Sequence, residues 1–257
     1  MSYRNYPQDP TSVIYQHYYN KNTKQTLSLV QQKHLKYQDG FFNGEHKIMT
    51  MSEALSQLNS YKDPSDPDTD GDNVIHAYQT AERIRKDYPN MEWFQVLGLI
   101  HDVGKILFTA DEPDFCVVGD TFPLGCQYRK ECVYSDFFID NPEQYTTLGI
   151  YKEKCGLDNL IMTYGHDEYL YNVLIDNNSI LPNLAHRIIR YHSFYPLHSY
   201  GAYTEFLDSD DMELVPWLQK FSDYDLYTKH DEFVLTDNIK QYYENLLKKY
   251  FPNPLIW

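Results

Sequence analysis

The sequence predicts a mainly α-helical fold, and two observations support this. Apolar residues recur at helical spacing from Val74 to Tyr88, and the segment from Trp93 to Leu107 is apolar on nearly every side, which is typical of a buried helix. No convincing series of alternating apolar and polar residues, the pattern of strands, follows or precedes them. We therefore expect all 257 residues to form one domain of packed helices.

The N-terminal part, residues 1–60, is expected to form an irregular arm with helical stretches near Thr23–Tyr37 and Thr50–Ser60. A loop follows at residues 61–73, where Pro, Gly, Asp and Asn crowd together and interrupt regular structure. The arm and the loop thus precede the long helical segments of the chain.

Residues 61–230 are expected to form the core of the domain. Asp72 or Asn73 is a suitable N-cap for the helix that begins near Val74. Residues 109–150 contain many Pro and Gly, and we expect an irregular insertion of the kind that often carries function. The remaining helices are expected near residues 157–163, 166–175, 182–193, 210–228 and 236–250, the last of which lies in a C-terminal part, residues 231–257.

Charge and composition exclude several classes of partner. With 22 Lys and Arg against 37 Asp and Glu, the formal net charge is -15, and the chain has no basic stripe. Such a field repels nucleic acid and anionic membranes, whereas a neutral substrate fits without conflict. No apolar run resembles a secretory signal or a membrane span, and the four cysteines form no CxxC pair. We expect a cytoplasmic protein with free thiols.

The strongest local signal is the string LGLIHDVGK, which places His101, Asp102 and Lys105 within five positions of an apolar helix. Charged groups are seldom buried without partners, because an unpaired charge in the interior is costly. A metal ion could compensate, with the imidazole as one ligand and Asp102 joining two ions through its two oxygens. Lys105 shares a helix face with this pair. The alternative is a buried ion pair without metal.

Further ligands are available on other expected helices, at His76, His166, His192 and Asp225. Four imidazoles and two carboxylates exceed what one catalytic zinc requires, and they suffice for two ions with open positions. Nitrogen and oxygen donors without thiolate favour iron or manganese. Spacing alone does not choose these ligands, because the chain has 10 His.

Longer strings resemble the HD-domain superfamily of metal-dependent proteins and, within it, the myo-inositol oxygenase family. The matching strings are SDPDTD (65–70), HAYQTAERIRK (76–86), LIHDVGK (99–105), VVGDTFPLGC (117–126), YGHDEYLY (164–171), IRYHSFYPLH (189–198) and DLYTK (225–229), with RNY (4–6) and the terminal PLIW. The resemblance covers nearly the whole chain. It implies an HD-domain-like helical bundle with an N-terminal lid segment.

The resemblance also implies the site residues. His76, His101, Asp102 and Asp225 would hold one iron, and Asp102 would bridge to a second iron held by His166 and His192. The substrate contacts that it implies are Arg4 on the lid, Asp63, Ser65, Asp66, Lys105, Gly119, Ser193 and Lys229. Lys105 and Asp102 would be the catalytic residues.

The implied reaction is a ring-opening oxidation of myo-inositol to D-glucuronate in inositol catabolism. It would use O2 as co-substrate and two Fe ions as a mixed-valent Fe(II)/Fe(III) pair. Lys105 would hydrogen-bond or protonate the polyol, and a desolvated lysine near cations is expected to have a lowered pKa. We expect a monomer that binds a small polyol and neither nucleic acid nor membrane.

Two other functions are open. An HD-type phosphohydrolase acting on nucleotides would use the same ligands, although the charge of -15 argues against it. A calcium-binding module could use Asp66, Asp68 and Asp70, which imitate the first half of an EF-hand loop, but Ala77 stands where the bidentate Glu belongs. The calcium hypothesis also leaves the buried charges around Asp102 unexplained.

Overall fold

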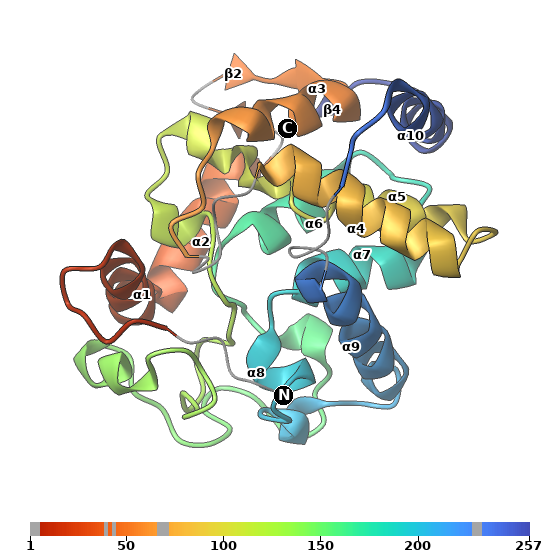
Figure 1. Ribbon diagram of the computed structural model, residues 1–257. Coiled ribbons are helices and arrows are strands. Elements are labelled where there is room, and N and C mark those ends of the chain that lie inside the picture. The colour runs from red at the N-terminus through yellow and green to blue at the C-terminus, as the bar shows by residue number, and fades with distance from the viewer. Residues whose placement is uncertain (1–5, 39–40, 43–44, 66–71, 228–232) are drawn as a thin grey trace.

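A computed structural model gives the fold of residues 6–38, 41–42, 45–65, 72–227 and 233–257. The predicted mainly helical fold is confirmed (Figure 1). The helices are α1 Val13–Lys24, α2 Leu27–Tyr37, α3 Met51–Gln57, α4 Asn73–Asp87, α5 Glu92–Ile100, α6 His166–Asp176, α7 Asn183–Tyr191, α8 Tyr195–His198, α9 Asp211–Tyr227 and α10 Asp237–Tyr250.

Five of the described helices form the centre of the molecule. Helix α4 packs along α5 and α6 packs along α7, while α9 contacts α4, α5 and α7 (Figure 1). Their apolar faces join one cluster of buried side chains, which includes Ala81, Leu97, Leu170, Ile188 and Phe221. Burial of this surface is the main stabilising contribution, at about 25 cal/mol per Å² of apolar area. Rigid helices from distant parts of the sequence therefore meet around one interior.

The β-structure of the described ranges consists of two short antiparallel sheets and one isolated bridge. Strand β1 (Phe41–Phe42) pairs with β2 (Glu45–His46). Strand β3 (Ile48–Met49) pairs with β4 (Leu255–Ile256), so the C-terminal segment returns to the N-terminal third of the chain. The indole of Trp257 is buried there and donates to the carbonyl of Met49 at 3.1 Å.

Helix α1 corrects the expectation of an irregular N-terminal arm. Its N-cap is Ser12, whose hydroxyl accepts from the backbone N–H of Tyr15. The residues that it buries include Tyr18, Lys21 and Asn22, which are polar or have a polar group. They recur at helical spacing, but apolar periodicity has no signal where a helix buries polar side chains.

Two further expectations are corrected. The helix expected over Trp93–Leu107 is α-helical only to Ile100, and a 3-10 helix (Val103–Ala110) follows. The helix expected at 157–163 is a 3-10 turn over Leu157–Asn159. Beyond that turn the backbone hydrogen-bonds across to the segment around Pro123, with which Met162 forms a β-bridge. Asp72 does cap α4, as predicted, by accepting from the N–H of Val74 at 2.8 Å.

None of the helices in the described ranges combines the length and the apolar character that crossing a bilayer requires.

Candidate metal centre

The structure brings all six predicted ligands together in the middle of the helical core. Each comes from a different position along the chain: His76 in α4, His101 at the end of α5, Asp102 directly after it, His166 at the start of α6, His192 at the end of α7 and Asp225 in α9. Their ligand atoms fall into overlapping sets of three, each within 4.8 Å. Five of the six side chains are buried and His76 is partly exposed.

The first group consists of His76, His101 and Asp225. The Nε2 atom of His76 lies 2.9 Å from Oδ1 of Asp225, and Nε2 of His101 lies 3.4 Å from the same oxygen. The hydroxyl of Tyr195 donates to the other oxygen, Oδ2, at 3.2 Å. Both oxygens of this carboxylate therefore have partners.

The second group consists of His166, His192 and Asp167. The Nε2 atoms of the two histidines lie only 3.2 Å apart. Oδ1 of Asp167 lies 2.7 Å from Nε2 of His166 and 3.4 Å from Nε2 of His192. Oδ2 of Asp167 is buried and has no hydrogen-bond partner among the described residues.

Asp102 lies between the two groups. Its Oδ2 is 3.5 Å from Nε2 of His101, and its Oδ1 is 3.3 Å from Nε2 of His166 and 3.7 Å from Nε2 of His192. One carboxylate oxygen faces each group. This is the arrangement that a carboxylate bridging two ions would require.

The backbone at the end of α5 places Asp102 between the two groups. His101 and Asp102 lie where α5 gives way to the 3-10 helix, not in the middle of one helix as expected. Gly104 follows, and a Cβ there would lie 2.1 Å from the carbonyl oxygen of His166. Only glycine allows the start of α6 to approach this closely.

The hydrogen bonds of three imidazoles fit a metal site. The Nδ1 atoms of His101, His166 and His192 each lie 2.8 Å from a backbone carbonyl, those of Gly98, Val117 and Ile189 respectively. A proton on Nδ1 leaves the lone pair on Nε2 directed into the centre. Two neutral rings with their protons on Nδ1 cannot hydrogen-bond to one another through Nε2 across 3.2 Å, so this contact requires a positive charge, either a proton on one ring or a metal ion.

The electrostatics of the centre also favour a cation. Burial alone would lower the pKa of His166, but the carboxylates of Asp167 and Asp102 outweigh it and raise the pKa to about 10. Burial would raise the pKa values of Asp102 and Asp225, yet neighbouring Lys105 and histidines hold them well below the usual range. The carboxylates are ionised and attract positive charge, which a proton or a metal ion can supply.

Lys105 is bracketed by two carboxylates. Its Nζ lies 2.9 Å from Oδ2 of Asp102 and 2.9 Å from Oδ2 of Asp63. Burial would lower the pKa of Lys105, but these two charges raise it in the chain without ions. The expected lowering of this pKa near cations stays a prediction. Burial would likewise raise the pKa of Asp63, and Lys105 with the hydrogen bonds of Ser65 lowers it to about 2.

The remaining predicted substrate residues divide into two sets. Ser193 directly follows His192, and its hydroxyl donates to Asp167 at 3.2 Å. Gly119 has φ +92° and packs against α1. Arg4, Asp66 and Lys229 lie outside the described residues.

The prediction missed Asp167 and Tyr195. Asp167 had a usable signal, because GHDEYLY contains a second His-Asp doublet like the one in LIHDVGK. Tyr195 is one of 25 tyrosines, and no pattern in the sequence distinguishes it.

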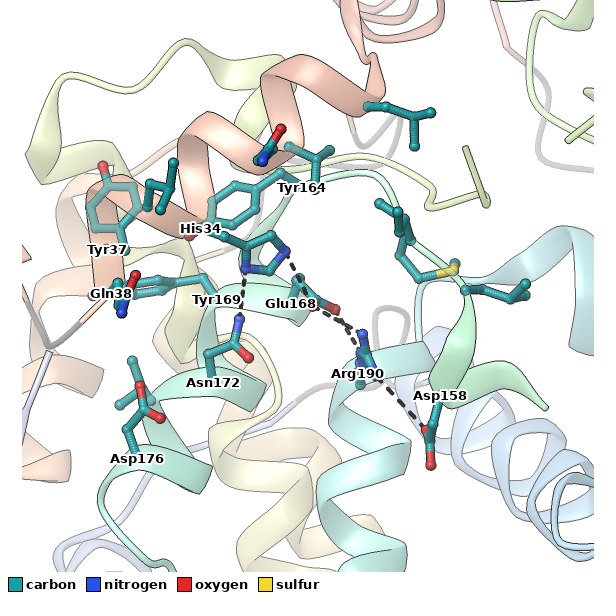
Figure 2. Close-up of a pocket in the computed structure, with 18 of the residues that line it drawn as sticks. His34, Tyr37, Gln38, Asp158, Tyr164, Glu168, Tyr169, Asn172, Asp176 and Arg190 are labelled. Carbon is teal, nitrogen blue, oxygen red and sulfur yellow. Dashed lines mark hydrogen bonds and ion pairs between the residues drawn. The ribbon is translucent and has the colours of Figure 1, made fainter. Parts of the chain in front are cut away.

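A separate cavity of about 1230 Å³ lies among α2, α6 and the C-terminal Trp257 (Figure 2). None of the six predicted ligands lines it. A chain of charges crosses it, in which Glu168 lies 3.6 Å from His34 and 2.7 Å from Arg190, and Arg190 lies 3.8 Å from Asp158. Glu168 and Arg190 link α6 to α7 close to the second group, so this network supports the centre from outside.

Fold and site together define a helical protein with a buried cluster of histidines and carboxylates that could hold metal ions. The family model described as "Myo-inositol oxygenase" matches residues 11–257. The chain belongs to the myo-inositol oxygenase family.

Similar proteins occur in animals and plants. The chain is 43% identical to "Inositol oxygenase" of Sus scrofa over 263 aligned positions, which cover all of this chain and 92% of that protein. It is 42% identical to "Inositol oxygenase" of Homo sapiens, covering 100% and 91% of the two chains. It is 43% identical to "Inositol oxygenase 5" of Arabidopsis thaliana, covering 94% and 79%.

Proposed function

We propose that this protein is an inositol oxygenase that opens the ring of myo-inositol with O2 to give D-glucuronate, in inositol catabolism. One observation carries the proposal most directly: the Nε2 atoms of His101, His166 and His192 surround the two oxygens of Asp102. Membership of the family and the names of the relatives supply the substrate and the reaction class.

The proposed cofactor is a mixed-valent pair of iron ions. One would be held by His76, His101, Asp102 and Asp225, and the other by Asp102, His166 and His192. The fit of these residues to cations rests on the buried lone pairs and ionised carboxylates described above, and the absence of thiolate favours iron or manganese over structural zinc. When bound, such a pair would supply Lewis acidity and a redox-active centre through which electrons pass from the polyol to O2.

The residues of the chain would orient the substrate and manage its protons. A lysine ammonium has three N–H donors, and Lys105 directs two of them at Asp102 and Asp63. The third N–H has no partner among the described residues, so it can donate to an oxygen of the polyol. Through this N–H, Lys105 would act as a hydrogen-bond donor to the substrate.

Short polar groups would complete the recognition of a neutral polyol. Asp63 and Ser65 form one side, and Ser193 lies at the second group. Gly119, and Arg4, Asp66 and Lys229 outside the described ranges, are proposed to complete the pocket. We further propose a single-domain, cytoplasmic, monomeric enzyme with Arg4 on a segment that closes over the substrate and excludes water.

The test is metal analysis combined with turnover. We expect about two irons per chain, the EPR signal of a coupled mixed-valent pair in a partly oxidised sample, and O2 uptake with D-glucuronate formation when myo-inositol is added. Chelator-treated protein, with and without added Fe(II), is the control. Protein that contains only zinc or calcium, or that hydrolyses phosphate esters without O2 uptake, would contradict the proposal.

A further inference from the structure

A short backbone segment, Val117–Thr121, hydrogen-bonds to residues at the second group. We call this segment the strap. The carbonyl of Val117 accepts from both the backbone N–H and Nδ1 of His166, each at 2.8 Å. At the other end, the N–H of Thr121 donates to the carbonyl of Ser193 at 2.9 Å. The strap thus contacts α6 at His166 and the residue that follows His192.

Helix α1 holds the other side of the strap. Nζ of Lys21 donates to the carbonyl of Val118 at 2.9 Å, and the hydroxyl of Tyr18 donates to Oδ1 of Asp120 at 3.1 Å. Between them Gly119 lies against α1, where a Cβ would be 2.7 Å from Nε2 of His17 and 3.0 Å from Cδ of Lys21. No space is left between helix and strap for even a methyl group.

Lys21 is the unusual member of this contact. It has no exposed surface, and among the described residues its ammonium has one hydrogen-bond partner, the carbonyl of Val118. Burial lowers the pKa of Lys21 to about 8, and negative charge on its surroundings, including Asp167 and Asp63, opposes that change. A buried ammonium without a contacting carboxylate destabilises the folded protein. If position 21 had only a structural role, an apolar side chain there would give a more stable fold.

We propose that Lys21 is a positioning residue for the second metal ion, a role that rests on the proposed two-ion centre. Its hydrogen bond fixes the Val118 carbonyl and so holds the adjacent Val117 carbonyl, which sets the tautomer and the direction of the His166 ring. Replacement of a residue that orients a metal ligand without binding the ion itself typically weakens metal binding by 10- to 100-fold.

The test compares Lys21→Met with Lys24→Met in full-length protein. Lys24 lies on the exposed side of the same helix, so its replacement controls for loss of a lysine from α1. Mn2+ is titrated into metal-free protein, and free Mn2+ is counted by EPR. For Lys21→Met we expect about 10- to 100-fold weaker binding of one ion and less than twofold change for the other. For Lys24→Met we expect both affinities to match the original protein.

Further readouts separate positioning from folding. Thermal unfolding of the metal-free variants reports stability, and nitrogen NMR of the imidazoles reports the His166 tautomer, which we expect to change only in Lys21→Met. Lys21→Gln keeps a donor but removes the charge, and intermediate weakening of the same single ion is expected. If Lys21→Met does not fold, the Lys21→Gln titration decides.

The outcomes distinguish the two proposals. Two ions bound by a Lys21 variant with unchanged affinity, or both ions weakened alike, would overturn the positioning role while leaving the two-ion centre intact. Fewer than two ions in the original protein would overturn the proposed function, and this inference with it.

Discussion

Two carboxylates at opposite ends of the centre differ in how completely they are partnered. Asp225 in the first group meets His76 through Oδ1 and Tyr195 through Oδ2. Asp167 in the second group meets His166 through Oδ1, and its Oδ2 is buried with no hydrogen-bond partner among the described residues. A buried oxygen left unpaired costs about 1–3 kcal/mol, so the carboxylate of the second group is less completely partnered than the carboxylate of the first.

This difference indicates that the two groups have different roles in the centre. At the first end both oxygens of the carboxylate have partners, and among the described residues the buried atom without a hydrogen-bond partner is Nε2 of His101, which is directed at the proposed first ion. At the second end two imidazole nitrogens are in contact, and Oδ2 of Asp167 has no hydrogen-bond partner among the described residues. Under the proposed function, substrate oxygens would complete the coordination of the ion at this end. Asp102 contacts both groups, so its replacement is expected to affect both proposed ion sites.

Asp102→Ala is therefore expected to have the largest effect. Without the bridging carboxylate neither ion keeps a full ligand set, and the buried ammonium of Lys105 loses one of its two partners. We expect the iron content to fall from about two per chain to near zero and turnover to be lost. Breaking such a buried pair also destabilises a protein by about 3–5 kcal/mol.

Iron analysis and chemical denaturation measure both effects. Asp102→Asn keeps the shape if the alanine variant does not fold, and Asp223→Ala on the exposed side of α9 is the matched control. Full iron content in Asp102→Ala would show that this residue does not bridge.

Lys105→Met is expected to act on chemistry while sparing the ions. Lys105 touches Asp102 and Asp63 but is not a ligand, so we expect iron content to remain near two per chain. Loss of its N–H donor from the substrate site should reduce turnover by about 10²–10⁴-fold. O2 uptake and iron analysis are measured together, with Lys240→Met on the surface as control. Loss of iron in parallel with activity would instead place Lys105 among the groups that hold the metal.

The sequence was sufficient for much of the fold because most core helices bury apolar faces. The segment around Ala81 has apolar residues at helical spacing, and its helix formed where expected. The apolar segment around Leu97 is also helical, although the α-helix ends at Ile100. Helix α1 was missed because it buries Tyr18, Lys21 and Asn22, whose partners are backbone carbonyls and one carboxylate far along the chain. Long-range hydrogen bonds leave no periodic apolar pattern.

Prediction of the site from the sequence was limited in a similar way. The doublet at His101 and Asp102 was found from burial and charge alone, whereas the choice of His166 and His192 among 10 His needed the family resemblance. Asp167 and Tyr195 were missed because their importance depends on which atoms converge after folding. The switch from α-helix to 3-10 helix after Ile100 was equally hidden, since it follows the close approach of α6 at Gly104.

Tyr195→Phe tests the comparison with the smallest expected effect. The change removes the hydroxyl that donates to Oδ2 of Asp225, so the carboxylate of the first group loses one hydrogen bond. Loss of one such hydrogen bond costs about 1 kcal/mol, and the first ion should bind up to about 10-fold more weakly while the second is unchanged. Tyr191→Phe is the matched control, because the Tyr191 hydroxyl donates to Asp158 at 3.0 Å, outside the centre. Mn2+ titration of both variants decides. Weaker binding of the second ion in Tyr195→Phe would contradict the prediction. It would show that the carboxylate of Asp225 affects the second group through Asp102.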